Sequence, residues 1–304
     1  MNILSVKNLK KNYNRGRTQA LKGVSFDVAE GEIFGLIGPD GAGKTTLFRI
    51  LTTMILADEG SAVIDGYDVV KDYKKIRQHI GYMPGRFSLY QDMTVEENLS
   101  FFATVFKTTI EENYHLVEDI YKQIEPFKKR RAGKLSGGMK QKLALSCALI
   151  HAPRVLFLDE PTTGVDPVSR KEFWEMLQKL KQNFKLSIIV STPYMDEAVQ
   201  CDRIALIQDG TFLTIDSPQS IIDNYAETLL AVKSDKMHRL LTDMRKTEGI
   251  KTAFAFGETH HATIEATVLT IDALRSRLEQ LGHSDIHIEQ VAPSIEDCFM
   301  NLQK

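Results

Sequence analysis

Short apolar runs recur along the first two thirds of the chain, and longer stretches with helical spacing separate them. The runs at residues 33–37, 155–158 and 186–190 contain almost no polar side chain, which is typical of strands buried on both faces. Buried strands that alternate with helices predict a mainly parallel sheet covered on both sides. Residues 3–13 and 20–29 read as earlier strands joined by a turn at residues 14–16. The pattern therefore predicts an α/β fold with an antiparallel β part at its N-terminus.

Further elements follow from the same reading. Residues 61–66 and 80–84 read as short strands that end in a turn or loop, and residues 203–207 and 211–213 as a hairpin. Residues 94–127 carry helical spacing, and Thr94 with Glu97 three residues later forms the pattern of a capping box. We therefore expect a mainly helical insertion between parts of the parallel core.

The pattern changes at about residue 218. Strands are predicted at residues 229–232, 252–256, 262–266 and 286–291, and helices at 235–246, 271–281 and 294–302. The order β-α-β-β-α-β resembles a ferredoxin-like unit. The sequence thus predicts a first domain at residues 1–217 and a small α+β accessory domain at 218–304, with a dimerisation or regulatory role. Histidines are frequent in the second domain, but no acidic or cysteine ligand accompanies them at helical spacing, which argues against a metal site; they are His260, His261, His283 and His287.

Composition narrows the class of protein. The chain has 304 residues with a net charge of −2, so it offers no global basic field for nucleic acid. Its three cysteines, Cys147, Cys201 and Cys298, form no CxxC pair, which fits a reducing cytoplasm and argues against zinc. The N-terminus lacks a signal-peptide pattern, and no apolar run is long enough to cross a bilayer. If the protein works at a membrane, we expect another chain to span it.

A glycine-rich stretch between a predicted strand and a predicted helix is the main candidate for chemistry. It matches the phosphate-binding pattern G-x-x-x-x-G-K-[ST], in which glycines let backbone N–H groups surround an anion beside a helix N-terminus. Lys44 would reach the β- and γ-phosphates of ATP, and the Thr45 hydroxyl would hold Mg²⁺. A chance match is the alternative, and the flanking strand and helix argue against it. The predicted nucleotide-binding residues are Gly38, Pro39, Asp40, Gly41, Ala42, Gly43, Lys44, Thr45 and Thr46.

Two carboxylates end the apolar strand at residues 155–161. A buried strand that brings Asp159 beside Thr45 would supply a second Mg²⁺ anchor. Successive strand residues point in opposite directions, so Glu160 is expected to do a different job and to polarise an attacking water. The alternative is an acidic pair exposed at the end of a strand.

Two further stretches point to the same nucleotide. Ser136 followed by Gly137 and Gly138 starts a helix and offers a second anion-binding end. One chain with one nucleotide does not need two such ends, whereas a head-to-tail dimer does; the alternative is a plain capped helix. Tyr13 ends the first strand and could stack on an adenine ring, or it is an ordinary half-exposed tyrosine.

These segments together resemble an ATP-binding cassette (ABC) ATPase over residues 1–217. In that family's terms, residues 38–46 look like the Walker A loop, 135–141 like the signature motif and 155–161 like the Walker B strand. Residues 164–166 resemble the D-loop, which implies that Asp166 helps bind nucleotide. Residues 38–41, 81–84 and 293–297 look like those of ABC-2 type exporters. The resemblance implies two cassettes that sandwich two ATP molecules and drive a membrane permease, with the chain peripheral on the cytoplasmic face of the membrane.

Three positions depart from the family pattern. Gly85 stands where the family usually has a glutamine that helps place Mg²⁺ and water, and Pro193 where it usually has a histidine that contacts the γ-phosphate. Neither glycine nor proline offers a side-chain hydrogen bond. Asp40 replaces the commoner asparagine, which is a milder change.

The departures leave two hypotheses open. Either the chain binds ATP, hydrolyses it poorly and completes the site of a different cassette, or it forms a homodimer that hydrolyses ATP with Glu160 alone. A module that binds ATP only to regulate is a further alternative. An ABC protein that acts on nucleic acid is disfavoured because the chain has one cassette, no coiled-coil insertion and no basic stripe. A P-loop kinase is disfavoured by the signature segment.

Overall fold

The computed structural model describes residues 1–265 and 267–303, and contacts divide the chain into two compact units, Met1–Pro218 and Gln219–Lys304. The predicted boundary after residue 217 lies one residue from this division. Each unit has its own apolar core. No helix within the described residues has both the length and the apolar character that crossing a bilayer requires.

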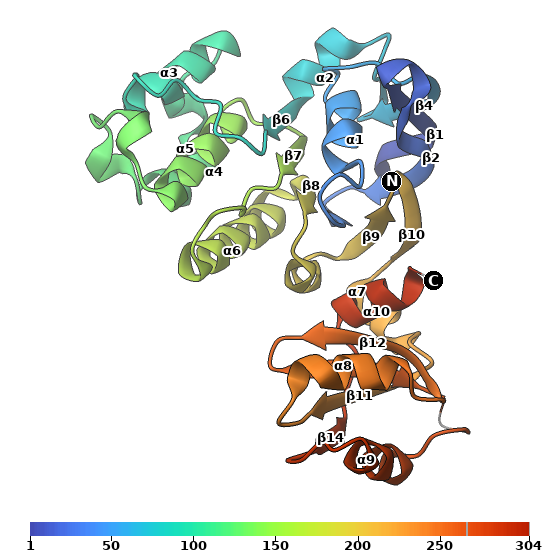
Figure 1. Ribbon diagram of the computed structural model, residues 1–304. Helices are drawn as coiled ribbons and strands as arrows, with labels where there is room; N and C mark the ends of the chain where they lie inside the picture. The colour runs from blue at the N-terminus through green and yellow to red at the C-terminus, as the bar shows by residue number, and fades with distance from the viewer. Residues whose placement is uncertain (266, 304) are drawn as a thin grey trace. The chain divides into compact units, whose positions relative to one another are not determined.

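A six-stranded sheet forms the centre of the first unit (Figure 1). Five of its strands are parallel to one another, and the edge strand β10 is antiparallel to β9. Every residue of β3, β7 and β8 is buried, as the apolar runs predict. Because β3, β8 and β7 are neighbours and parallel, their carboxyl ends meet at one edge of the sheet. The order is β10 (Thr211–Asp216), β9 (Arg203–Gln208), β3 (Ile33–Ile37), β8 (Ser187–Thr192), β7 (Val155–Asp159) and β6 (Ile80–Met83).

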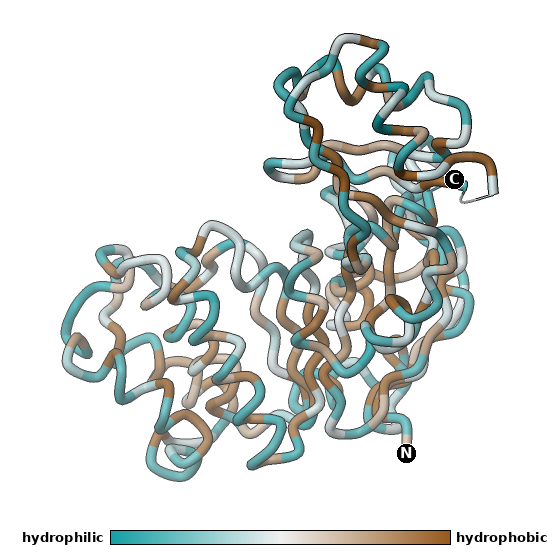
Figure 2. Tube along the Cα trace, turned by 90° about the horizontal axis from the view of Figure 1, so that it is seen from below, coloured by the Kyte–Doolittle hydropathy of each residue, from teal (hydrophilic) through white to brown (hydrophobic). Residues whose placement is uncertain are grey.

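A second, antiparallel sheet carries the N-terminal β part. Its order is β2 (Thr18–Ala29), β1 (Asn2–Tyr13), β4 (Glu59–Ile64) and β5 (Tyr67–Asp68). Helix α1 (Lys44–Leu51) buries Leu47, Phe48 and Leu51 in a core that also contains residues of both sheets, among them Leu4 and Phe157. Figure 2 shows brown, apolar segments running through the middle of this unit. Strand β5 and helix α2 (Tyr73–His79) were not predicted from the sequence.

The helical insertion lies to one side of the sheets in Figure 1. It contains α3 (Val95–Val105), α4 (Ile110–Tyr121), the short 3₁₀ turns Glu125–Phe127 and Ala132–Lys134, and α5 (Gly137–Leu149). The capping box at the start of α3 is confirmed: the Thr94 N–H donates to Glu97 Oε2 at 2.7 Å, and the Glu97 N–H donates to Thr94 Oγ1 at 3.2 Å. Two more helical segments follow β7 and β8, namely α6 (Pro167–Phe184) and the 3₁₀ helix η4 (Met195–Gln200).

The second unit has the predicted ferredoxin-like order. Its sheet runs β12-β13-β11-β14, with every pair antiparallel, and α8 and α9 bury leucines and a methionine in its core. The predicted strand at 262–266 begins earlier in the structure, and Ala266 lies outside the described residues. The elements are α7 (Pro218–Asp223), β11 (Thr228–Lys233), α8 (Met237–Arg245), β12 (Ile250–Phe256), β13 (Thr259–Ile264), α9 (Ile271–Gln280), β14 (His287–Gln290) and α10 (Ile295–Leu302).

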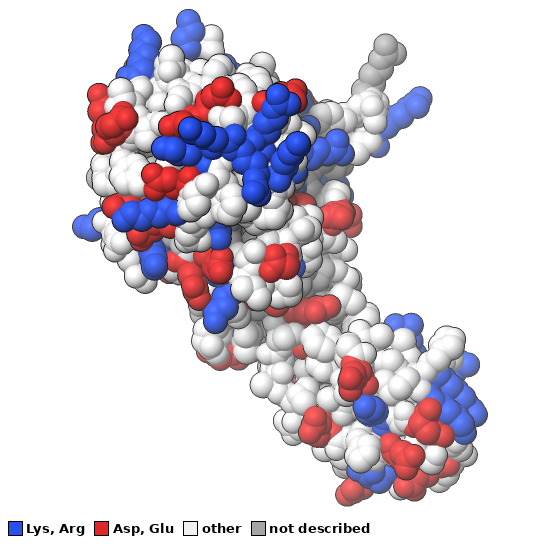
Figure 3. Space-filling model, turned by 90° about the vertical axis from the view of Figure 1, so that its left-hand side faces the viewer, with Lys and Arg blue, Asp and Glu red and all other residues white. Residues whose placement is uncertain are grey.

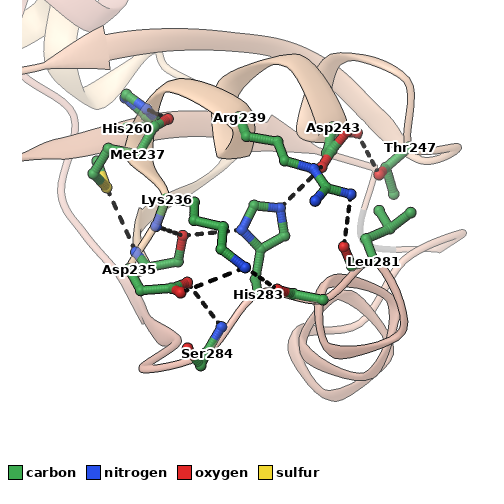
Figure 4. A network of polar contacts seen from close by, with 12 residues as sticks. Asp235, Lys236, Met237, Arg239, Asp243, Thr247, His260, Leu281, His283 and Ser284 are labelled. Atoms are coloured by element: carbon green, nitrogen blue, oxygen red, sulfur yellow. Dashed lines mark hydrogen bonds and ion pairs between the residues drawn. The ribbon is translucent and has the colours of Figure 1, made fainter.

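His260, His261 and His283 take part in internal hydrogen bonds. The His283 ring, whose side chain is fully buried, lies between Ser234 Oγ at 3.2 Å and Asp243 Oδ2 at 2.9 Å (Figure 4). The hydrogen bond between His283 and Asp243, together with the nearby Arg239 guanidinium, holds the pKa of the Asp243 carboxyl below its usual range, against the opposing effect of burial. His261 Nδ1 lies 2.7 Å from Asp297 Oδ1. These contacts join the loop before β14 to α8, and β13 to α10.

Candidate functional site

The phosphate loop joins the buried end of β3 to α1. A Cβ atom on Gly38 would lie 2.1 Å from the Ile207 carbonyl oxygen, and one on Gly43 would lie 2.4 Å from that of Ala20. Gly43 also has φ +108°, which side chains rarely adopt. Among the residues that the structure describes, no side chain caps the first turn of α1, so its backbone N–H groups are available to an anion. The loop therefore has the shape that its glycine pattern predicts.

Lys44 lies at the centre of this loop. Its side chain is buried, and Nζ donates to the carbonyl oxygens of Gly38 at 2.7 Å and Pro39 at 3.0 Å. Glu160 Oε1 lies 3.4 Å from the same ammonium group. A buried ammonium group held by the loop it serves is well placed for a phosphate.

Thr45 and Asp159 meet beside Lys44, as the sequence predicts. Thr45 Oγ1 donates to Asp159 Oδ1 at 3.3 Å, and the Asp159 side chain is almost fully buried. Ser191 Oγ donates to the same oxygen at 2.6 Å. The Asp159 charge, after burial, contributes to raising the pKa of the nearby Tyr82 to about 12. A hydroxyl and a carboxylate are the hard oxygen ligands that Mg²⁺ prefers, so these residues fit that ion.

Ser191 was not identified from the sequence as part of the site. It lies near the end of β8, directly beside Asp159 in the parallel pairing of β7 and β8. A polar residue at the carboxyl end of an otherwise apolar strand was the available signal. Only the order of strands in the sheet shows that it lies next to Asp159.

Glu160 departs from the expectation based on strand geometry. It lies just beyond β7 with φ +50°, so the alternation of side chains along a strand does not reach it. Its N–H donates to Ser191 O at 3.0 Å and to Ser191 Oγ at 3.1 Å. Glu160 and Asp159 therefore point toward the adjacent residues Lys44 and Thr45, and not to opposite faces of the sheet. A left-handed conformation held by two hydrogen bonds is a kind of strain that clusters at functional sites.

A buried hydrogen bond holds the segment after Glu160. Thr162, which is fully buried, donates through Oγ1 to Glu197 Oε1 at 2.7 Å. Glu197 comes from η4, and Arg170 Nε of α6 lies 3.7 Å from the same oxygen. This contact ties the Glu160 segment to the loop that follows β8, and the sequence analysis missed it.

Gly85 and Pro193 lie near this centre. A Cβ on Gly85 would be 3.1 Å from the Asp159 carbonyl oxygen and 3.8 Å from Glu160 Cβ. Gly85, Glu160 and Gly164 line a cavity of about 150 Å³. Pro193 directly follows β8, and the ring of the next residue, Tyr194, lies 4.2 Å from the Arg170 guanidinium.

The signature segment starts α5. Ser136 is the N-cap, with Oγ accepting from Met139 N at 3.3 Å. A Cβ on Gly138 would lie 2.8 Å from Ser169 Oγ, so the glycine permits the start of α5 to approach α6. No hydrogen bond between described residues joins residues 136–138 to the phosphate loop of the same chain.

Asp166 and Tyr13 have local roles in the structure. Asp166 caps α6 by accepting from Ser169 N at 3.0 Å, and this hydrogen bond lowers the pKa of its carboxyl. Tyr13 ends β1, half-buried, with Lys11 Nζ 5.9 Å from its ring centre. Their predicted contacts with nucleotide stay predictions.

A largely apolar groove of about 670 Å³ lies between the end of β6 and the helical insertion. Its rim exposes two large apolar side chains, Met54 at 58 % and Val105 at 56 %. Burial raises the pKa of the Cys147 thiol on its wall. Other lining residues include Tyr82, Phe102, Phe106 and His151.

Comparisons with known proteins point in one direction. The family model described as "ABC transporter" matches residues 21–163. The "Probable multidrug ABC transporter ATP-binding protein YbhF" of Escherichia coli (strain K12) is 34% identical over 304 residues, which cover 99% of this chain and 52% of that protein. The chain thus spans about half the length of that relative. The "Nod factor export ATP-binding protein I" of Rhizobium sp. (strain N33) is 33% identical over 291 residues, covering 94% of this chain and 93% of that protein.

Solved structures show the same likeness. A structure of cbiO1 from Clostridium perfringens, described as part of the ABC transporter complex cbiONQ, has a TM-score of 0.66 and 29% identity, covering 73% of this chain and 91% of that one. The ATP-binding cassette MJ0796, solved as a dimer in a post-hydrolysis state with ADP and Pi, has a TM-score of 0.63 and 28% identity, covering 70% of this chain and 98% of that one.

Proposed function

The chain belongs to the family of ABC transporter ATP-binding proteins, and we propose that it drives the membrane permease of an ABC-2 type exporter. Members of this family bind and hydrolyse ATP, so the chain is an ATP-binding subunit and an ATPase. Relatives named for multidrug and Nod factor export support the exporter class. The proposed location is the cytoplasmic face of the membrane, against the permease.

The main support for a hydrolytic role of Glu160 is that its Oε1 lies 3.4 Å from Lys44 Nζ. Lys44 and the N–H groups of residues 38–46 would hold the phosphates, and the Glu160 carboxylate would accept a proton from the attacking water. Mg²⁺ held by Thr45 and Asp159 would neutralise charge on the phosphates. Ser191 would fix Asp159 through its 2.6 Å hydrogen bond, and would fix Glu160 through its backbone. The adenine contact is assigned to Tyr13.

We propose that a second cassette completes the site. The anion-binding start of α5, formed by Ser136, Gly137 and Gly138, is free to face another chain's nucleotide because it makes no hydrogen bond to its own phosphate loop within the described residues. In the head-to-tail arrangement, Asp166 and its neighbours would lie close to the partner's nucleotide. The dimer of the similar cassette MJ0796 supports this pairing.

The permease is proposed to dock into the apolar groove beside β6. The groove has a volume of about 670 Å³ and a rim of exposed apolar side chains, including Met54 and Val105. A short amphipathic helix from a permease loop would bury these groups. Tyr82 and Met83 of β6 line the groove. Gly85, two residues after Met83, lines the cavity that Glu160 also lines. A permease segment docked in the groove would therefore contact the strand that leads directly to the nucleotide site.

The test is steady-state ATP hydrolysis by the purified chain and by Glu160→Gln, with ATP binding measured in parallel. Loss of a general base should lower kcat by about 10²- to 10⁴-fold. ATP binding should persist, because the side chain of Glu160 is partly exposed and its fixed position depends on its backbone. Absence of ATP binding by the wild-type chain would refute the whole proposal, and equal turnover by both proteins would remove Glu160 from the catalytic role.

A second candidate rests on Gly85 and Pro193. Gly85 lies beside Asp159 and Glu160, and Pro193 directly follows Thr192, whose carbonyl oxygen accepts from the Gly38 N–H at 3.3 Å. Neither residue carries a hydrogen-bonding side chain, which favours a hydrolysis-poor half of a heterodimer that completes the site of a different cassette. Mixing the chain with a cassette that carries glutamine and histidine at these positions should then raise turnover above the sum of the separate proteins. No gain on mixing would favour the homodimer.

A further inference from the structure

Positive charge is concentrated in one segment of the helical insertion. Residues 122–142 contain eight lysines and arginines and one acidic residue, Glu125, in a chain whose net charge is −2. The expectation that the chain lacks a basic stripe is therefore wrong for this segment, because it was drawn from the overall charge. Four of the basic residues are consecutive; we call them the basic arch, and they are Lys128, Lys129, Arg130 and Arg131.

The arch is held in place by its backbone. The carbonyl oxygens of Lys128 and Arg130 accept from the N–H groups of Glu96 and Val95, both at 3.1 Å. Just beyond the arch, the N–H of Ala132 donates to Met93 O at 2.8 Å. The arch is thus fixed to the start of α3 through main-chain atoms.

Few close ion pairs engage these side chains, and the Arg131 charge adds only a smaller lowering of the Glu97 pKa to that of the Thr94 hydrogen bonds. Lys129, Arg130 and Arg131 are exposed, and within residues 1–265 and 267–303 they make no ion pair. Lys128 is 3.9 Å from Glu96 Oε1, with its side chain 43% exposed, a separation at which an exposed pair contributes little. In Figure 3, which looks onto the side of the molecule where the helical insertion lies, blue side chains gather into one continuous area.

The arch adjoins the proposed permease groove. The N–H of Gly133 donates to Gln91 O at 2.9 Å, and Leu89, two residues earlier, lines the groove. The same short stretch before α3 therefore forms part of the groove wall and the support of the arch. If a permease segment occupies the groove, the arch lies close to that segment.

We propose that the basic arch binds the anionic headgroups of phospholipids beside the permease, an inference that rests on the proposed docking groove. Clusters of four or more Lys and Arg next to a membrane attract anionic lipid. Lipid is favoured over nucleic acid because the arch side chains come from the segment between two short 3₁₀ turns and not from a helix that could enter a groove. The neighbouring Phe127 ring is already covered by the Arg130 guanidinium, 4.6 Å from its centre, so that ring face is not free to stack on a base. Such contacts would hold the chain at the membrane when the permease releases it.

The test measures co-sedimentation of the full chain, without ATP, with vesicles of phosphatidylcholine alone or mixed with phosphatidylglycerol. The arch variant changes all four arch residues to glutamine. The matched control removes four charges from exposed lysines elsewhere: Lys7→Gln, Lys22→Gln, Lys171→Gln and Lys179→Gln. The wild-type chain and the control should bind mixed vesicles, less tightly as salt rises, and the arch variant should bind on the order of a hundredfold more weakly.

Several outcomes would overturn the inference. These are equal binding of the wild-type chain to both vesicle types, equal loss in the control, or displacement of vesicles by duplex DNA at lower concentration than by free phosphatidylglycerol headgroup. A drop in basal ATP hydrolysis in the arch variant with unchanged vesicle binding would assign the arch to the nucleotide site. The vesicle assay uses no ATP, so its result does not depend on the hydrolysis test. If Glu160→Gln failed to lower turnover, vesicle binding by the arch could still be confirmed or refuted.

Discussion

Restoring a side chain at Gly85 offers a direct test of whether the site is hydrolysis-poor. No positive φ prevents a larger residue there, since Gly85 lies outside the left-handed region. A Cβ would lie 3.1 Å from the Asp159 carbonyl oxygen, so that oxygen must give by a few tenths of an ångström. The rest of a glutamine can enter the 150 Å³ cavity that Glu160 also lines, several times the roughly 30 Å³ of one water molecule.

The expected gain follows from what one positioned polar group contributes. Removal of a single well-placed donor costs enzymes about 10²- to 10³-fold in kcat. If the absence of this group limits the chain, Gly85→Gln should raise kcat by about a hundredfold and leave the ATP KM within a few-fold. Replacement of glycine in an allowed conformation stabilises a fold by about 0.4–1 kcal/mol, which offsets part of the close contact with Asp159. The variant should therefore fold normally.

The assay is steady-state ATP hydrolysis at saturating ATP, with thermal unfolding measured on the same samples. Gly85→Ala is the control, because it adds the Cβ and the backbone restriction without the amide. A gain in the glutamine variant alone supports the hydrolysis-poor reading. Equal activity of the alanine and glutamine variants would refute the reasoning, as would a wild-type kcat that already equals that of Gly85→Gln.

Three further predictions concern the loop, its support and the second unit. Thr162→Val should lower the free energy of unfolding by about 1.5–3 kcal/mol, because it removes a hydrogen bond to the buried Glu197 carboxylate, and it should lower kcat with unchanged ATP affinity. Thr162→Ser, which keeps the hydroxyl, should restore both the stability and kcat. A kcat that follows stability alone would contradict a positioning role for Thr162. Gly38→Ala should abolish ATP binding in an equilibrium titration, because its Cβ would meet a backbone oxygen at 2.1 Å; wild-type affinity would refute the assigned loop. The pKa of Asp243 is lowered below 3.8, chiefly by its hydrogen bond to His283, so the stabilisation is present above that pH and is lost as pH falls through the folded pKa. The difference in unfolding temperature between wild type and Asp243→Asn should therefore shrink below about pH 3.8, and a gap independent of pH would contradict this.

The sequence alone predicts those elements that are specified by residues close together in the chain. The apolar runs of β3, β7 and β8, the capping box at Thr94 and the glycine pattern around Gly38 each depend on neighbours in the chain. The order of elements in the second unit was also predicted, because turns and apolar spacing mark it. By contrast, α2 and α7 were missed, since each has fewer than eight residues and too few apolar positions to establish a period.

Tertiary structure decided which residues from distant segments contact the predicted site residues. The sequence placed Asp159 and Glu160 on opposite faces, and the structure brings both to the phosphate loop because the chain leaves the strand conformation at Glu160. Ser191 and Glu197 come from segments more than thirty residues away in the chain and reach the site only through the pairing of β7 with β8. Periodicity and glycine patterns report a residue's own backbone, so they determine where a loop or strand lies. Hydrogen bonds and ion pairs between distant segments depend on strand order and packing, which no local pattern records.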